Sequence, residues 1–340
     1  MKKNLFFLAA AAVALASCTS DDTIAENSAA LSNQQQEIAF APIAQPSSRG
    51  QYSVITTDFP ENNTMEVAAY QTQPTAVSYF EKCTFSKGAG TTWKGSKYWP
   101  LSAAKINFFA VSGYGVDASK ITIANNLLTA SVDYSKPTYS ESTQSDIMYA
   151  FGRGFVKQDG NALYFNRNDA GTDQPVGMVF KHALALVDFE VKGQTATETA
   201  KITVNSITVK DGIYNGSLAL ANANANTEDG TVTTTVTWTP GTSVDEVAVP
   251  GISANTAITD SYARIGNGLM IIPGTGFTSF VINYTFDGKT YDYEYTLPSA
   301  LTSVAANKYT YRITFKLHEI EIAPTVAEWT NTNNDITVVN

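Results

Sequence analysis

Few residues in this 340-residue chain are of the types that carry out acid–base, nucleophilic or metal chemistry. The sequence has two histidines, His182 and His318, and two cysteines, Cys18 and Cys83, and their spacing matches no zinc site. It contains no nucleophile elbow, phosphate-binding loop or dinucleotide-binding glycine motif. His182 adjoins an apolar segment, where a structural histidine is commoner than a catalytic one because catalysis needs converging partners. We therefore predict a protein that is not an enzyme and that uses no cofactor and no metal.

Acidic and aromatic residues leave two other kinds of site to weigh. Asp58, Glu61 and Glu66 could act as paired carboxylates, but scattered solvated acids are the commoner case. The four tryptophans and 17 tyrosines could form a platform on which sugar rings stack. At alternating positions of strands, however, aromatic residues more often fill a core. Neither set by itself predicts a catalytic or binding site.

Cys18 is the residue whose surroundings indicate a definite chemistry. A basic start and an apolar run from Leu5 to Leu15 form a secretory signal peptide, which is too short for a mature transmembrane helix. The following Ala16-Ser17-Cys18 resembles the lipobox that the lipoprotein signal peptidase recognises. We predict that residues 1–17 are removed and that Cys18 is acylated, so that its chains, at about 0.8 kcal/mol per buried methylene, anchor the protein to a bacterial membrane. The alternative is an ordinary signal peptide with a chance cysteine.

Charge and cysteine content restrict the class of protein further. The chain has 22 basic and 31 acidic residues, a formal charge of −9, which argues against a nucleic-acid partner. With Cys18 acylated, Cys83 has no partner and no disulfide is expected. An exported fold without disulfides needs a sizeable apolar core, which this length allows, and the length also favours two domains.

Alternation of apolar and polar residues indicates an all-β protein. The clearest run extends from Tyr309 to Leu317, with Tyr309, Tyr311, Ile313 and Phe315 on one face. Two other runs, 280–286 and 291–297, flank Asp287-Gly288, a dipeptide favoured in tight hairpin turns. Period-two alternation marks strands with one buried face, and such short strands between Gly, Pro and Asn residues favour antiparallel β-sandwiches. We expect two such domains in tandem.

Composition divides the chain into sections. Residues 18–49 form a propeptide in which a polar tether precedes a short strand at Glu37–Ala41, and Gln45–Gly50 has the composition of an exposed linker. The predicted N-terminal domain is 50–181, the C-terminal domain is 182–329, and the tail is 330–340. We expect a loop, and not a repeat, in the Ala/Asn-rich stretch at 219–226.

Several segments together resemble the fimbrillin family, the subunits of type V pili. They are, in chain order, the lipobox at Cys18, the strand Ile38-Ala39-Phe40 followed by Arg49, Asp146-Ile147-Met148-Tyr149-Ala150, Phe180-Lys181-His182-Ala183-Leu184-Ala185, Leu269-Met270-Ile271-Ile272-Pro273, Asn307-Lys308-Tyr309-Thr310-Tyr311 and Trp329. Each segment is weak alone, but their order and spacing are specific, and they span nearly the whole chain. The resemblance implies two transthyretin-like, Greek-key β-sandwich domains.

The resemblance also implies a route of assembly. Such pilins are exported as lipoproteins to the outer membrane and cell surface, and Asp21 and Asp22 resemble a surface-export signal. An arginine-specific protease then cleaves between Arg49 and Gly50 and releases the N-terminal strand. The C-terminal strand of a neighbouring pilin subunit fills the groove that this strand leaves, and a fimbria grows.

The tail and the leaving strand carry matching apolar pairs. Ile38 and Phe40 lie at i and i+2 in the leaving strand, as Ile336 and Val338 do in the predicted donor strand. The tail could instead be the ordinary last strand of its own domain.

A second functional class is a tip adhesin or a surface lipoprotein that binds glycans or proteins. A terminal adhesin need not donate a strand, so a transferable tail favours the stalk subunit.

Overall fold

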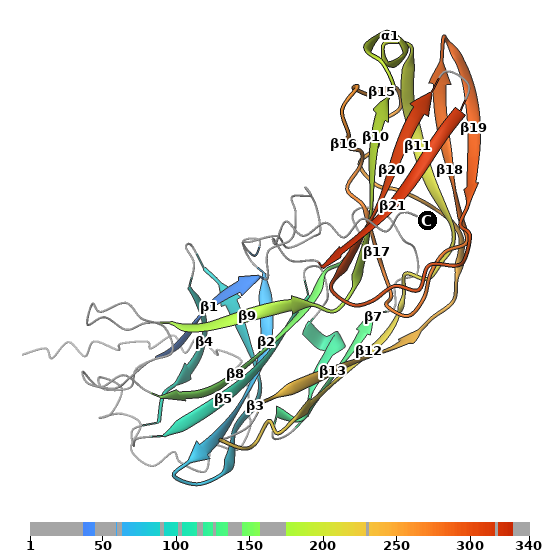
Figure 1. Ribbon diagram of the computed structural model, residues 1–340. Coiled ribbons are helices and arrows are strands. Elements are labelled where there is room, and N and C mark those ends of the chain that lie inside the picture. The colour runs from blue at the N-terminus through green and yellow to red at the C-terminus, as the bar shows by residue number, and fades with distance from the viewer. Residues whose placement is uncertain are drawn as a thin grey trace, which may run out of the picture. The chain divides into compact units, whose positions relative to one another are not determined.

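The computed structural model describes residues 37–44, 59, 63–88, 92–100, 104–113, 118–124, 127–134, 145–156, 175–228, 231–316 and 319–328 (Figure 1). These ranges are built of strands, together with a short α-helix, α1 (Ala196–Thr199), and a 3-10 turn, η1 (Ala118–Lys120). The all-β prediction is confirmed. No helix in the described ranges has the length and apolarity to cross a bilayer.

The N-terminal part of the fold is a closed barrel. Its strands are β1 (Glu37–Ala44), β2 (Thr64–Gln73), β3 (Val77–Lys87), β4 (Trp93–Tyr98), β5 (Lys105–Gly113), β8 (Ile147–Val156) and β9 (Val176–His182), in the order β1-β4-β3-β2-β5-β8-β9. Phe80, Cys83 and Phe85 of β3 are buried in the apolar cluster inside the barrel, and the pairing of β3 with β2 is irregular between Phe80 and Cys83.

A second, four-stranded sheet packs on the outside of this barrel. It contains β6 (Ile121–Ile123), β7 (Thr129–Tyr134), β12 (Gly216–Ala223) and β13 (Thr233–Pro240), in the order β13-β12-β7-β6. Ala68 and Tyr70 of β2, and Phe109 and Val111 of β5, face this sheet and share its apolar cluster. Because β2 and β5 are covered on both faces, their central residues, 67–70 and 108–111, are continuously apolar where a half-exposed strand would alternate.

The expected loop at 219–226 is wrong for most of its length. Residues up to Ala223 belong to β12, and a turn follows it. Leu218, Leu220 and Asn222 alternate inward between alanines, and β12 pairs with β7 on one side and β13 on the other. Alanine is depleted in strands, so the composition of this stretch does not indicate β12. This sheet joins segments from before and after residue 182.

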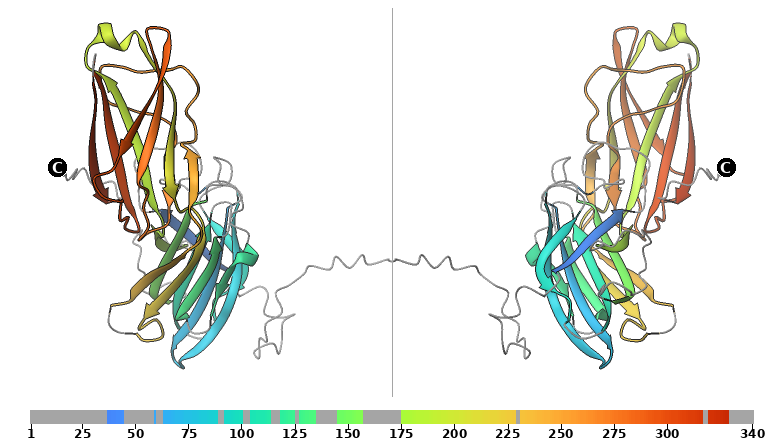
Figure 2. Two further views of the ribbon diagram at one scale, coloured as in Figure 1. Left: turned by 90° about the vertical axis from the view of Figure 1, so that its right-hand side faces the viewer. Right: turned by 90° about the vertical axis from the view of Figure 1, so that its left-hand side faces the viewer.

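The C-terminal part is a sandwich of two five-stranded sheets, which Figure 2 shows from two sides. One sheet has the order β16-β10-β20-β21, with β17 also paired to β10, and the other has the order β14-β11-β18-β19, with β15 paired to β11. Their bounds are β10 (Ala185–Gly193), β11 (Ile202–Gly212), β14 (Val244–Ala248), β15 (Thr256–Ala257), β16 (Ala263–Arg264), β17 (Leu269–Ile271), β18 (Ser279–Phe286), β19 (Lys289–Thr296), β20 (Asn307–Lys316) and β21 (Glu319–Glu328).

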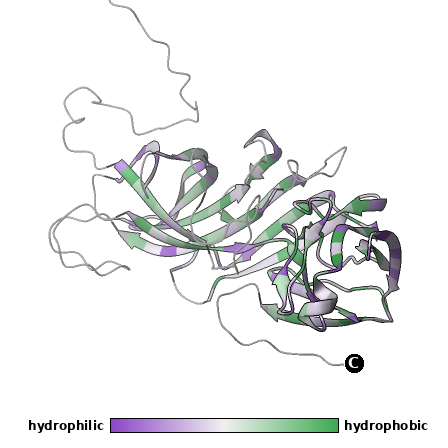
Figure 3. Ribbon diagram, turned by 90° about the horizontal axis from the view of Figure 1, so that it is seen from above, coloured by the Kyte–Doolittle hydropathy of each residue, from purple (hydrophilic) through white to green (hydrophobic). Residues whose placement is uncertain are grey.

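Hydropathy alternates along the strands of this sandwich, as the banding of Figure 3 shows. Phe189, Phe280 and Tyr311 meet in its core, with ring centroids between 5.1 and 5.7 Å apart. The predicted hairpin at Asp287-Gly288 is confirmed, because β18 and β19 pair across it and both turn residues have positive φ. Most neighbouring strands are antiparallel, but β1 runs parallel to β9 and β10 runs parallel to β20.

Candidate strand-exchange site

β1 closes the barrel by lying between two strands that are far apart in the sequence. Its first half pairs with β4 in antiparallel register, with Phe40 opposite Trp93. Its second half pairs with β9 in parallel register, from Phe40 opposite Val176 to Ala44 opposite Phe180. Figure 1 shows β1 in blue beside β4 and β9. A chain without β1 would therefore expose the facing edges of β4 and β9.

The side chains of β1 fill the core of the barrel. Ile38 and Phe40 are both 0% exposed. The Phe40 ring meets Phe85 and Phe108 edge to face, with centroids 4.8 and 5.0 Å away. Burying each such side chain contributes about 1.5–3 kcal/mol. Removal of β1 would leave an apolar slot lined by these rings and bounded by two unpaired edges, which is the arrangement that accepts an added strand.

The polar contacts of β1 are weak by comparison. Glu37 forms an ion pair with Lys94 at 3.2 Å and accepts a hydrogen bond from the backbone N–H of Ser96 at 3.3 Å, both near solvent. An exposed pair of this kind contributes about 0–1 kcal/mol. Apolar burial and backbone pairing thus hold the strand, and both could be supplied by another strand with a similar pattern.

The other residues predicted for processing and exchange lie outside the described residues. These are Cys18, Arg49, Gly50, Ile336 and Val338, together with His318 and Trp329. The last described strand, β21, lies at an edge of its sheet and pairs with β20. The structure therefore gives the surroundings of the leaving strand, and the donor strand stays a prediction.

Of the residues weighed for catalysis, the structure describes His182, Cys83 and Glu66, and all three are buried, whereas Asp58 and Glu61 lie outside the described residues. His182 Nδ1 lies 3.0 Å from Asp146 Oδ2, and both side chains are fully buried. Cys83 is a buried thiol whose sulfur lies 3.3 Å from the Gly95 carbonyl oxygen. Burial raises the pKa of the Glu66 carboxyl above its ordinary value, while a hydrogen bond from Thr84 at 2.7 Å acts in the opposite direction. Among the described residues, no group of three or more His, Cys, Asp or Glu side chains is arranged to hold a metal.

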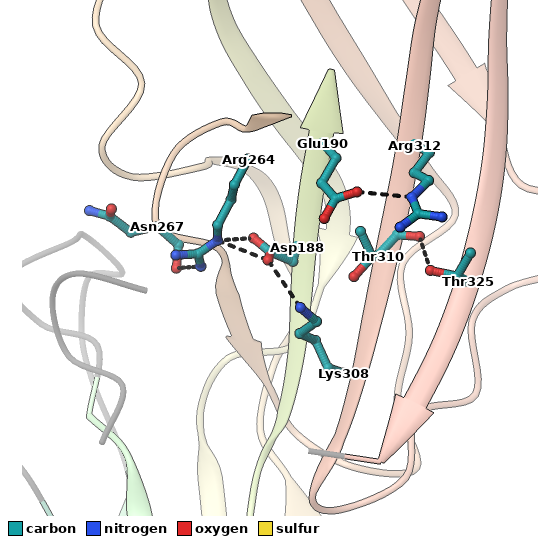
Figure 4. A network of polar contacts seen from close by, with 8 residues as sticks. All are labelled: Asp188, Glu190, Arg264, Asn267, Lys308, Thr310, Arg312 and Thr325. Atoms are coloured by element: carbon teal, nitrogen blue, oxygen red, sulfur yellow. Dashed lines mark hydrogen bonds and ion pairs between the residues drawn. The ribbon is translucent and has the colours of Figure 1, made fainter. Parts of the chain in front are cut away.

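A charged network on the first sheet of the sandwich escaped sequence reasoning (Figure 4). The Arg264 Nε of β16 donates to both carboxylate oxygens of Asp188 on β10, at 2.6 and 2.8 Å, and Lys308 of β20 lies 3.7 Å from the same carboxylate. Beside it, Arg312 Nε is 2.9 Å from Glu190 Oε2. These contacts hold β16 and β20 against β10. They require the sheet's register, which charge spacing along one chain does not reveal.

Comparison with known proteins agrees with this architecture. No curated protein matches the chain by sequence. A candidate cell adhesion protein from Bacteroides ovatus ATCC 8483 superposes with a TM-score of 0.50 and 12% identity, over 88% of this chain and 99% of that one. A candidate cell adhesion protein from Bacteroides uniformis ATCC 8492 gives 0.49 and 17%, over 88% and 99%. A fimbrial protein from Bacteroides vulgatus ATCC 8482 gives 0.45 and 17%, over 86% and 99%.

At these identities a structural likeness concerns the fold alone. The family model of fimbrillin-like proteins, by contrast, matches residues 53–329, which is most of the sequence and includes the sandwich and every barrel strand except β1. The chain therefore belongs to the fimbrillin-like family.

Proposed function

We propose that this protein is a structural subunit of a cell-surface fimbria that polymerises by donor-strand exchange and supports adhesion. Family membership makes it a structural protein and not an enzyme. The observation that carries the exchange step is the position of β1, which fills the barrel core with Ile38 and Phe40 and separates β4 from β9. A strand that closes a barrel from the chain's N-terminal end can be cut away without interrupting the rest of the fold.

The proposed route begins with export. Residues 1–17 are removed, lipid on Cys18 anchors the precursor to the outer membrane, and an arginine-specific protease cleaves between Arg49 and Gly50. Until cleavage, β1 covers the slot and blocks premature pairing at the edges of β4 and β9. The mature subunit comprises the predicted domains 50–181 and 182–329 and the tail 330–340.

The neighbouring subunit then fills the slot with its own tail. Ile336 and Val338 present an apolar pair at i and i+2, matching Ile38 and Phe40, and backbone hydrogen bonds provide affinity while the pockets fix register. Each subunit gives a tail and receives one, so the contact is head-to-tail and produces an open filament. The partners are other pilin subunits and the membrane, and no nucleic acid is involved.

Substitution in the tail tests this function. A carboxylate buried without a partner costs several kcal/mol or is neutralised. Ile336→Asp should leave the monomer folded, with unchanged circular dichroism and melting temperature, but abolish filaments in electron micrographs. Thr337→Asp, on the opposite face, is the matched control and should polymerise. An unfolded Ile336→Asp monomer would assign the tail to its own domain, and a polymerising one would exclude exchange through this tail.

A terminal adhesin or surface-binding lipoprotein is the second candidate function. One observation favours it: an open cleft with cationic and aromatic walls lies on the outside of the barrel. A terminal subunit would bind a ligand there without donating a strand. Cells that lack this protein but still form normal filaments, and that lose adhesion, would favour this candidate over the stalk subunit.

A further inference from the structure

A cleft of about 490 Å³ lies where β8 and β9 separate beside β13. Among the described residues, these two strands pair at Met148 with His182 and at Tyr149 with Lys181. Beyond that point β9 pairs with β1, whereas β8 stays with β5, so the two strands diverge (Figure 1). The cleft is lined by Tyr149, Ala150, Phe151, Arg153, Val179, Lys181, Val232, Thr233 and Thr234.

The charge of the cleft is opposite to that of the protein. Among the residues that the structure describes, the lining includes two cations, Arg153 and Lys181, and no carboxylate, although the chain as a whole carries a formal charge of −9. Lys181 is exposed, and no ion pair engages it within the described part of the chain. A partly enclosed cationic site in an acidic protein attracts an anionic group more strongly than any neutral one.

Aromatic rings form the floor beside these cations. Tyr149 and Phe151 alternate on the outer face of β8 and are half-buried against the cluster beneath the four-stranded sheet, with Phe151 6.4 Å from the Phe109 ring. Burial raises the pKa of the Tyr149 hydroxyl, so this group stays protonated and can donate. Amphipathic rings of this kind offer an apolar face and a polar edge together, which suits the C–H face and the hydroxyls of a sugar.

The turn that precedes the cleft residues of β13 in the chain is held in place by hydrogen bonds. Arg153 Nη2 donates to Thr227 Oγ1 at 3.4 Å and to the Asn224 carbonyl, and the buried Asn107 Nδ2 donates to the Ala225 carbonyl at 2.8 Å. The turn between β12 and β13 is thereby fixed to β5 and β8. A fixed turn next to the cleft reduces the ordering cost of binding.

We propose that this cleft binds a saccharide that bears a carboxylate. The carboxylate pairs with Lys181 in the field of Arg153, and the sugar ring lies on Tyr149 and Phe151, with the exposed Thr233 hydroxyl within the same cleft. A uronic acid and a sialic acid share this chemistry. Binding at this cleft would be a further property of the subunit. It does not require polymerisation, so it can be tested on the monomer.

Titration calorimetry on the purified full chain distinguishes the ligands. We expect trigalacturonate or 3′-sialyllactose to bind, and the better of the two to identify the source of the acid. The neutral partners, galactotriose and lactose, should bind at least about tenfold more weakly, as when one charge-assisted hydrogen bond is lost. Affinity for the acidic sugar should fall as salt is raised.

Substitutions locate the site. Lys181→Gln, which removes the charge but keeps a polar side chain, should weaken acidic-sugar binding about tenfold, and Tyr149→Ala should weaken both acidic and neutral sugars. Lys289→Gln, at an exposed lysine of the β18–β19 hairpin, is the matched control and should change nothing. Melting temperatures within about 1 °C of wild type confirm that the fold is intact. Four results would each overturn the proposal. They are equal binding of acidic and neutral sugars, acidic-sugar binding that Lys181→Gln does not change, no binding of either acidic sugar, and equally strong binding of a hexaglutamate peptide.

Discussion

His182 Nδ1 lies 3.0 Å from Asp146 Oδ2 and 3.1 Å from Oδ1, with both side chains fully buried. The two residues are 36 positions apart and belong to two of the internal segments that resemble the fimbrillin family. They join the beginning of β8 to the end of β9, next to the pair Met148–His182 from which the two strands diverge. The contact therefore anchors the closed end of the cleft as well as the barrel seam.

Loss of this contact should destabilise the barrel. Asp146→Ala removes an acceptor from a buried donor, and we expect the free energy of unfolding to fall by about 1–3 kcal/mol. Chemical denaturation measures the change. Asp133→Ala breaks the exposed Lys120–Asp133 pair and should cost less than about 1 kcal/mol. Equal effects of the two substitutions would show that the buried contact has no special role.

Phe40→Ala should be among the most damaging changes in the uncleaved chain. It opens a cavity against Phe85 and Phe108, and large-to-small changes of this kind cost about 3–5 kcal/mol. Val77→Ala, on β3 of the same barrel but 47% exposed, should stay within about 0.5 kcal/mol. After cleavage at Arg49 and loss of β1, the wild type and the Phe40→Ala variant become the same molecule, so any remaining difference in stability would contradict release of the strand.

The Arg264–Asp188 pair should stabilise the sandwich more than a surface pair does. Arg264→Met leaves the Asp188 carboxylate, which is 2% exposed, with Lys308 at 3.7 Å. Breaking a buried pair by removing one partner costs about 3–5 kcal/mol, and Lys308 should keep the loss near the lower limit. Lys120→Met, at an exposed pair, is the control. Denaturant midpoints that shift equally in both variants would refute this account.

Glu66 should make stability fall as pH rises. Because burial raises its folded-state pKa above 4.5, its contribution is fully present below that value and is lost as pH rises through the folded pKa. The glutamine of Glu66→Gln cannot ionise, so the melting temperature of this variant should rise relative to that of wild type as pH increases from 4 to 7. Glu294 has a pKa lowered by a hydrogen bond from Ser279 and by Lys210, so the stability that it contributes is present above pH 4.5 and is lost as pH falls through its folded-state pKa. The melting temperature of Glu294→Gln should therefore fall relative to that of wild type as pH rises toward 4.5. A difference in melting temperature between Glu66→Gln and wild type that stays constant from pH 4 to pH 7 would contradict the prediction.

Processing at the N-terminus can be followed by mass. Subunits from purified filaments should begin at Gly50, and Arg49→Gln should keep residues 18–49 attached and prevent polymerisation. Arg49→Lys preserves the charge and should still resist an arginine-specific protease. Palmitate should label the wild-type precursor and not Cys18→Ala. Filaments that retain Ile38 and Phe40, or equal labelling of the two proteins, would remove the corresponding step from the route.

The sequence by itself located strands in which apolar and polar residues alternate, and one tight turn, although in β20 the polar residues Thr310 and Thr314 are buried as well. Alternation from Tyr309 onward marks β20, and Asp287-Gly288 marks the β18–β19 hairpin, because side-chain period and turn chemistry are local properties. The order of family segments was likewise readable without a structure, and Ile38 and Phe40 identified β1 as an apolar strand.

Only the tertiary structure decided which strands meet. Alternation states that one face is buried but not what covers it, so the parallel contact of β1 with β9 and the pairing of β12 with β7 could not be read from sequence. The same limit applies to Asp146 with His182, Asp188 with Arg264, and Tyr149 with Lys181. Each pair comes from segments distant along the chain, and only sheet register brings their side chains within a few ångströms of one another.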